Sequence, residues 1–304
     1  MDKKRILITG GTGLLGESLV QKCKYKYEVT ATYVGVYEVN NYDHVAYIKM
    51  DIMDYEGNHQ IFKQFRPHVV IHTASIGSPD FAEKNKDLTW QINVDGTKTI
   101  LSLCEQYDCK FVYISSNGIY DGEHAPYSED DIPEPINYYG MVKLEGEKVT
   151  RMSRATSSIV RPILLYGWNH PFERPNIVTI ALDKLSKGET MMAYDDVIIN
   201  PLYVEDCSEG ILRIIENERY ETFNFAGKEK ASIYGLLKKA AEVFNLDAAS
   251  VLPVKQGYFN ELVPRPRDTS YATDKMEKVL ELKPAGIEEG LIIMKKQRNE
   301  KDCK

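Results

Sequence analysis

Three residues near the middle of the chain, Ser116, Tyr139 and Lys143, are of the types that hold and transfer protons. A free tyrosine titrates at about 10 and is a poor acid at neutral pH, whereas a neighbouring ammonium favours the phenolate and lowers that pKa. A serine hydroxyl can hold a substrate carbonyl in line with the phenol, and both groups oppose the charge that develops when hydride arrives. Together these residues predict a reductase or dehydrogenase site.

The elements that would position these residues can be recognised in the sequence around them. Residues 111–114 are apolar, aromatic or β-branched, so Ser115 and Ser116 are expected at the carboxyl end of a buried strand. Open α/β sheets bind ligands at that end. Asn137 can cap a helix that carries the tyrosine and the lysine on one face.

The four-residue spacing between a tyrosine and a lysine is not specific by itself. The chain repeats it at Tyr234 and Lys238 and at Tyr271 and Lys275, which we interpret as ordinary helix-surface or helix-entry residues. Tyr139 is distinguished by the serine-ended strand before it and by a glycine-rich loop near the beginning of the chain.

That loop has the pattern of a dinucleotide site. A buried-strand pattern at 5–9 is followed by Gly10, Gly13 and Gly16, and then by an amphipathic stretch. A strand, a glycine turn and a helix in this order let the backbone approach a diphosphate that faces the helix amino terminus. The sequence therefore predicts a bound NADP or NAD.

The residue at the end of the second expected strand, 28–33, bears on the choice between the two cofactors. It is Tyr33, where a carboxylate would bind a ribose 2′-hydroxyl and repel a 2′-phosphate. The absence of a carboxylate at this position favours NADPH. However, no arginine lies between Arg5 and Arg66 to hold the 2′-phosphate.

The length and the order of the elements indicate the fold class. A chain of 304 residues with 43% hydrophobic content can form one large and one smaller domain. Alternating strands and helices predict an α/β fold, a Rossmann-type doubly wound parallel sheet with a smaller C-terminal α/β substrate domain. We place the NAD(P)-binding domain at 1–167 and a mainly substrate-binding domain at 168–304, from which some segments return to the sheet.

Composition argues against several classes of protein. The formal charge of −7 and the lack of a basic stripe argue against nucleic-acid binding. No segment approaches the ~18 apolar residues of a membrane helix, and five scattered cysteines indicate a reduced, cytoplasmic protein. His68 and His72 would lie about 13 Å apart along a strand, too far for one metal ion. We therefore assign no metal-binding residues and expect no membrane or nucleic-acid partner. A homodimer is possible.

Five motifs, in chain order, resemble the extended short-chain dehydrogenase/reductases. They are Thr-Gly-Gly-Thr-Gly-Leu-Leu-Gly (9–16), Asn-Val-Asp-Gly-Thr (93–97), Tyr-Ile-Ser-Ser (113–116), Tyr-Gly-Met-Val-Lys (139–143) and Arg-Pro-Ile-Leu-Leu-Tyr-Gly (161–167). Four stretches, 119–122, 126–133, 135–140 and 143–147, are similar within that family to dTDP-4-dehydrorhamnose reductases. The resemblance implies an NAD(P)H-dependent reduction of a nucleotide-linked 4-keto-6-deoxysugar, with Ser116, Tyr139 and Lys143 as the catalytic set.

Two features keep other functions open. The reductases usually have Ser-Thr-Asp where this chain has Ser-Ser-Asn at 115–117. The same stretches also resemble the regulatory β subunit of methionine adenosyltransferase, a relative that binds NADP and acts as an interaction protein. The alternatives are therefore an NAD-dependent nucleotide-sugar epimerase or dehydratase, and a non-catalytic NADP-binding regulatory subunit.

The motifs and the resemblance together assign two groups of contacts. To the cofactor they assign Gly10, Thr12, Gly13, Leu14, Leu15, Gly16, Tyr33, Asp51, Ile52, Thr73, Ala74, Ser75, Asn93, Tyr139, Lys143, Arg161 and Pro162. To the nucleotide-sugar substrate they assign Ser115, Asn117, Asn200, Arg265 and Arg267. Prolines on either side of Arg265 force extended backbone, so both arginines could clamp a diphosphate; a solvated or subunit-facing loop is the alternative.

Overall fold

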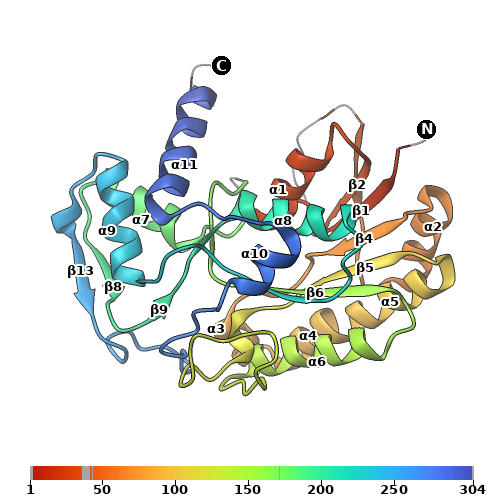
Figure 1. Ribbon diagram of the computed structural model, residues 1–304, viewed down its shortest axis with the longest axis horizontal. Coiled ribbons are helices and arrows are strands. Elements are labelled where there is room, and N and C mark those ends of the chain that lie inside the picture. The colour runs from red at the N-terminus through yellow and green to blue at the C-terminus, as the bar shows by residue number, and fades with distance from the viewer. Residues whose placement is uncertain (1–2, 36–41, 43, 171, 303–304) are drawn as a thin grey trace.

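Short runs of β-branched and aromatic residues form a seven-stranded parallel sheet in the computed structural model, which describes residues 3–35, 42, 44–170 and 172–302. The strands are β1 (Arg5–Thr9), β2 (Glu28–Tyr33), β3 (Val45–Lys49), β4 (Val69–His72), β5 (Lys110–Ile114), β6 (Ser157–Pro162) and β11 (Thr222–Phe225). Their order is β11-β6-β5-β4-β1-β2-β3 (Figure 1). The direction of strand addition reverses between β1 and β4, as in a doubly wound fold, so the expected fold class is confirmed.

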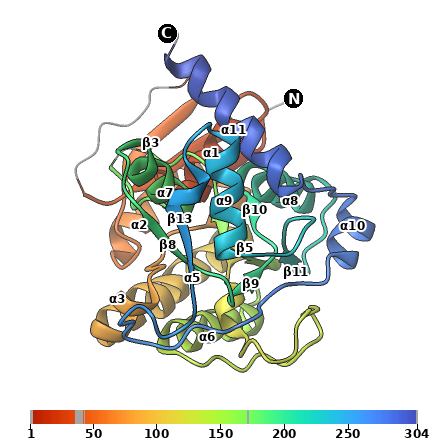
Figure 2. The same ribbon diagram turned by 90° about the vertical axis from the view of Figure 1, so that its left-hand side faces the viewer.

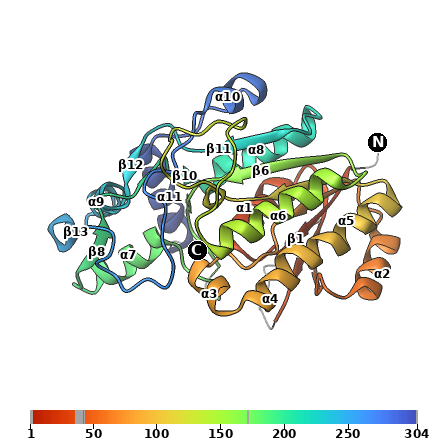
Figure 3. The same ribbon diagram turned by 90° about the horizontal axis from the view of Figure 1, so that it is seen from below.

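Helices cover both faces of this sheet, which explains why the central strands are buried on both faces. Ile6 and Ile8 belong to one hydrophobic core, whereas Leu7 between them belongs to the other, because successive side chains point to opposite faces. On one face lie α1 (Leu14–Cys23) and α8 (Val204–Glu216). The other carries α2 (Tyr55–Phe65), α5 (Gly96–Tyr107) and α6 (Tyr138–Met152) (Figures 1 and 3).

The helical segment between β4 and β5, residues 79–107, is interrupted. The segment divides into α3 (Pro79–Lys84), α4 (Lys86–Trp90) and a π-helical turn η1 (Gln91–Asp95) before α5. Within η1 the Asn93 amide accepts a hydrogen bond from the Ile76 amide at 2.7 Å and donates to the Ile76 carbonyl at 3.0 Å. The turn therefore anchors the chain that leaves β4.

The C-terminal part forms a smaller layer beside the carboxyl ends of the strands (Figures 1 and 2). Its helices are α7 (Ile177–Ser186), α9 (Ile233–Val243), α10 (Asp274–Leu280) and α11 (Ile287–Asp302). Its short strand pairs are β7 (Leu165–Tyr166) with β10 (Leu202–Tyr203), β8 (Met191–Tyr194) with β13 (Val251–Val254), and β9 (Ile198–Ile199) with β12 (Ala231–Ser232). The 3-10 turn η3 (Ala248–Ser250) precedes β13 in this layer. Another 3-10 turn, η2 (Asn117–Ile119), follows β5 in the first half of the chain.

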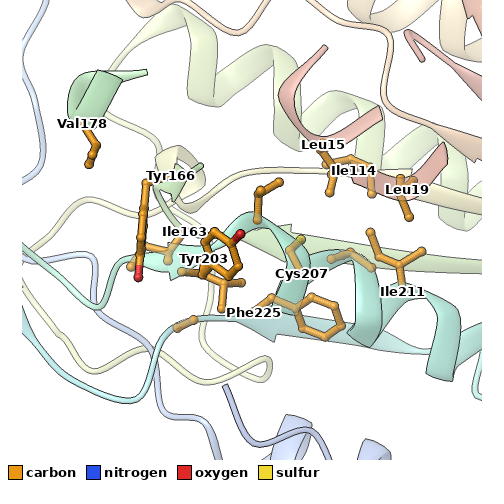
Figure 4. Close-up of a cluster of buried hydrophobic side chains, with 14 of the residues drawn as sticks. Leu15, Leu19, Ile114, Ile163, Tyr166, Val178, Tyr203, Cys207, Ile211 and Phe225 are labelled. Atoms are coloured by element: carbon orange, nitrogen blue, oxygen red, sulfur yellow. The ribbon is translucent and has the colours of Figure 1, made fainter. Parts of the chain in front are cut away.

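The two parts of the chain share the hydrophobic core that contains Ile6 and Ile8. Figure 4 shows Leu19 of α1 and Ile211 of α8 beside Phe225 of β11, with Tyr166 and Val178 continuing the cluster toward the C-terminal layer. The edge strand β11 pairs with β6 although it lies far beyond residue 167. Two elements from the second half of the chain therefore belong to the Rossmann-type part: β11 extends its sheet and α8 covers one face of that sheet.

The last helix extends into a polar stretch at the end of the described chain. From residue 295 the sequence is mainly polar, and α11 continues through it to Asp302; residues 303 and 304 lie outside the described part. The Lys295 ammonium donates to the carbonyl oxygen of Val243 at 2.7 Å, which ties α11 to α9. Within the ranges that the structure describes, every helix is too short or too polar to cross a membrane.

Candidate functional site

A cavity of about 290 Å³ opens where the strand order reverses, at the carboxyl ends of β1, β2 and β4. Nine of the residues assigned to the cofactor line it, namely Gly10, Thr12, Gly13, Tyr33, Asp51, Ile52, Thr73, Ala74 and Ser75. Leu14, Leu15, Gly16 and Asn93 are not among its lining residues. They support it instead, since Leu15 packs in the core and Asn93 anchors the Ile76 backbone.

The glycines of the loop after β1 have different tasks. A Cβ on Gly16 would lie 2.1 Å from the carbonyl oxygen of Gly10, so that glycine is required for the helix to pack against the turn. A Cβ on Gly13 would meet only the same oxygen, at an ordinary 3.4 Å. Gly13 precedes the first residue of α1 and lines the cavity. A glycine there leaves room for a ligand to approach the backbone, so these residues fit a dinucleotide diphosphate.

Ser116 and Tyr139 meet at the carboxyl end of β5. The Asn137 side chain accepts from the Gly140 amide at 3.0 Å and begins α6, as predicted, with Tyr139 in its first turn. The Ser116 hydroxyl accepts from the Gly118 amide at 3.1 Å. A Cβ on Gly118 would lie 3.3 Å from the Tyr139 ring and 3.5 Å from the Ser116 hydroxyl oxygen, so these two side chains lie close together. The sequence motifs thus come together as expected.

The electrostatics of the phenol differ from the expectation that Lys143 lowers its pKa. Burial raises the pKa of Tyr139, whereas the Ser116 hydroxyl and the Arg174 guanidinium lower it. The tyrosine is therefore a neutral phenol at pH 7, able to donate a proton. The cation that acts on it comes from the loop before α7, which sequence reasoning did not identify.

Lys143 lies in α6, one turn after Tyr139, and its side chain is buried against β5. Its side chain crosses the Tyr113 ring at 5.5 Å from the centroid, and its ammonium donates to the carbonyl oxygen of Ile114 at 3.0 Å. Burial lowers the pKa of Lys143 to about 8, with Glu147 acting in the opposite direction. The ammonium is thus charged at neutral pH.

Ser115, assigned to the substrate, and Arg161, assigned to the cofactor, share a protein partner in this structure. Both bind the buried carboxylate of Glu147: the Ser115 hydroxyl donates at 2.6 Å, and the Arg161 guanidinium donates twice, at 2.8 and 2.7 Å. Arg161 also donates to the Tyr120 hydroxyl at 2.8 Å. A buried charge needs such pairing, so this network holds β5, β6 and α6 in register. Pro162 ends β6.

Asn200, assigned to the substrate, also has a protein partner. Its amide donates to the Tyr271 carbonyl oxygen at 3.1 Å and accepts from the Tyr271 amide at 3.0 Å, both buried. Asn117, assigned to the substrate too, donates to the Thr269 hydroxyl at 2.7 Å. The Asn117 bond holds the extended segment 263–271 against the loop after β5, and the Asn200 bonds hold it against the chain after β9.

Arg265 and Arg267 share a second pocket of about 570 Å³, with Asp121, Glu123 and Glu134 in its lining. Arg265 is already paired, with Asp80 at 2.6 Å and with Glu261 at 3.3 Å. Arg267 is the exposed member of the two. The predicted diphosphate clamp therefore reduces to Arg267, in a pocket that also carries negative charge.

The remaining histidine and tyrosine patterns have structural partners. His72 is bonded to Thr9 at 2.8 Å and to Thr97 at 3.2 Å, and His68 accepts from the Arg5 amide at 2.9 Å. In α9 the Lys238 ammonium lies over the Tyr234 ring on the helix surface, 5.6 Å from its centroid.

Three residues at the site were missed. Glu147 lies one helical turn after Lys143 in the sequence, and that spacing was a usable signal. Glu173 and Arg174 had no local signal, because their role depends on where the loop after β7 crosses the molecule.

Comparison with known proteins agrees with this geometry. The solved structure of a dTDP-4-dehydrorhamnose reductase from Bacillus anthracis, in complex with NADP, matches with a TM-score of 0.86 and 27% identity, covering 98% of this chain and 100% of that one. Methionine adenosyltransferase 2 subunit beta from Bos taurus is 29% identical over 268 residues, 83% of this chain and 75% of that protein. The spore coat polysaccharide biosynthesis protein SpsK from Bacillus subtilis is 25% identical over 264 residues, 86% and 87% of the two. The model of the family described as RmlD substrate binding domain matches residues 4–298, and the chain therefore belongs to that family.

Proposed function

We propose that this protein is an NAD(P)H-dependent reductase of a nucleotide-linked 4-keto-6-deoxysugar, of the dTDP-4-dehydrorhamnose reductase type. The observation that carries the proposal is the meeting of Ser116, Tyr139 and Lys143 at the carboxyl end of β5, the strand that follows β4 across the sheet. The glycine-lined cavity lies at the ends of β1, β2 and β4.

NADP or NAD would be held by the backbone of the loop after β1, with Tyr33 and Asp51 around its adenosine half. The bound nicotinamide would supply the hydride for the keto carbon. Gly13 supports this assignment, because it lines the cavity and a Cβ there would meet only the carbonyl oxygen of Gly10.

The residues of the chain supply the proton and the orientation. Tyr139, kept neutral by burial, would donate its phenolic proton to the substrate oxygen, and Ser116 would hold that oxygen by a second hydrogen bond. Lys143, fixed on the Ile114 carbonyl, would bind the nicotinamide ribose, and the Arg174 guanidinium would help stabilise the phenolate that proton transfer leaves. Glu147 and Arg161 keep that lysine and its helix in place.

We propose the division at residue 167 on the same basis. The nucleotide part would comprise 1–167 with α8 and β11, and the sugar nucleotide would lie between it and the remaining C-terminal elements, near Asn117 and Arg267.

A second candidate is a dinucleotide-binding regulatory subunit, which the similarity to the bovine methionine adenosyltransferase subunit favours. The two functions are separated by mixing purified protein, NADPH and an enzymatically made dTDP-4-keto-6-deoxyhexose while NADPH absorbance is followed. Stoichiometric loss of absorbance supports the reductase. Interconversion of the sugar without net loss would indicate an epimerase, and NADPH binding without turnover of any 4-ketosugar tested would favour the regulatory subunit.

A further inference from the structure

A carboxylate from the second half of the chain reaches the glycine-rich loop. The Thr12 hydroxyl donates to Oε1 of Glu173 at 2.7 Å, and both residues line the cavity at the end of β1. Thr12 is 5% exposed, so little of it remains for another partner. Glu173 itself comes from the loop between β7 and α7.

The neighbouring residue ties the same stretch to the other side of the cavity. The Arg174 guanidinium donates to the carbonyl oxygen of Gly77 at 3.4 Å, in the loop after β4. The loops after β1 and β4 flank the cavity, since the strands are neighbours in the sheet. Two adjacent side chains thus span from one loop to the other and hold the Glu173 carboxylate at the glycine turn.

The glycine turn before α1, where the Glu173 carboxylate lies, is a favourable position for an anion. The loop of Thr12 and Gly13 leads directly into α1, whose first backbone amides carry partial positive charge. A dinucleotide diphosphate would use the same loop, and it carries negative charge like Glu173. The two anions cannot share it without repulsion.

We propose that Glu173 is an internal competitor of the diphosphate, which must leave Thr12 before a dinucleotide can bind fully. The inference rests on the proposed dinucleotide site and adds a residue that sets its affinity. It requires that neutralising Glu173 strengthens binding, whereas removing an ordinary ligand contact would weaken it. Glu173→Gln is the suitable change, because it keeps the size of the side chain and an acceptor for Thr12 while removing the charge.

The test is calorimetric titration of NADPH and of ADP-ribose into wild type, Glu173→Gln and Glu189→Gln. Glu189 is an exposed acid in the turn after α7 and serves as the charge-matched control. For Glu173→Gln we expect about tenfold tighter binding of both ligands, the scale of a hydrogen bond to a charged group. The gain should shrink from 0.05 to 0.5 M NaCl, roughly as the screening length falls. Adenosine, which lacks the diphosphate, should show no gain.

The outcomes are distinct. Equal affinities in all three proteins, or weaker binding to Glu173→Gln, would overturn the competition, and weaker binding would mark Glu173 as a ligand contact. If wild type and Glu173→Gln both fail to bind either diphosphate ligand, the dinucleotide site itself is wrong and the inference falls with it. A gain of equal size with adenosine would also reject it, since the effect would then not involve the diphosphate. Glu173→Ala provides a second variant with the same expected direction.

Discussion

The Lys143 ammonium donates a hydrogen bond to the carbonyl oxygen of Ile114, 3.0 Å away, at the carboxyl end of β5. Lys143 is 3% exposed, and its charge is therefore held in place at a cost in hydration. This contact joins α6, which carries Tyr139, to the strand that carries Ser116. Burial of the Lys143 charge therefore lowers the free energy of unfolding, although the contact helps to position the site.

Lys143→Met should stabilise the fold while it abolishes function. Because burial lowers the pKa of Lys143 from 10.5 to about 8, the unfolded chain binds more protons between these values, and the free energy of unfolding rises with pH there. Below pH 8 the full penalty is present, about 3 kcal/mol at most. We expect the variant to be about 1–3 kcal/mol more stable than wild type at pH 7, with the gap closing toward pH 10.

Urea unfolding of both proteins at several pH values measures this gap. Lys238→Met, which removes an exposed lysine from α9, is the control and should leave the pH dependence of wild type unchanged. A Lys143→Met protein that is less stable at pH 7, with a gap independent of pH, would contradict the assigned burial cost.

Tyr139→Phe should lower kcat by roughly 10²–10⁴-fold, because it removes the proton donor and little else. Tyr234→Phe is a close match as a control, since Tyr234 also lies in the first turn of a helix with a lysine four residues later. Steady-state kinetics should show the wild-type kcat for Tyr234→Phe. Dinucleotide titration should show the wild-type affinity for both variants. Wild-type turnover in Tyr139→Phe would remove the tyrosine from the mechanism.

Arg267→Ala should raise KM for the nucleotide sugar by about ten- to hundredfold, because it removes a charge-assisted contact to the diphosphate. Arg265→Ala should act on stability instead, since it leaves Asp80 and Glu261 without their common partner. Kinetics and thermal unfolding of the two variants separate these effects. If Arg267→Ala keeps the wild-type KM, the second pocket is not the substrate's diphosphate site.

Tyr33→Asp should shift the cofactor preference from NADPH toward NADH. Tyr33 lines the cavity at the end of β2, and a carboxylate there would bind a ribose 2′-hydroxyl and repel a 2′-phosphate. Parallel titrations of the two reduced cofactors into each protein give the ratio of affinities. A wild-type protein that strongly prefers NADH would refute our interpretation of this position.

The sequence by itself determined the features whose causes are local. Asn137 and Ser232 cap their helices through amides three residues away, and the glycine loop, the apolar strands and their alternation with helices need only neighbouring residues. From these features the sheet, the dinucleotide cavity and the meeting of Ser116 with Tyr139 could all be predicted.

Only the tertiary structure decided which buried polar groups bind each other. Asn200 is held by Tyr271, 71 residues later, and Thr12 by Glu173, 161 residues later. A buried donor or acceptor must be satisfied, but no local pattern states which distant group will satisfy it. The partner depends on how loops from the C-terminal half cross the ends of the strands, which is set by packing of the whole chain.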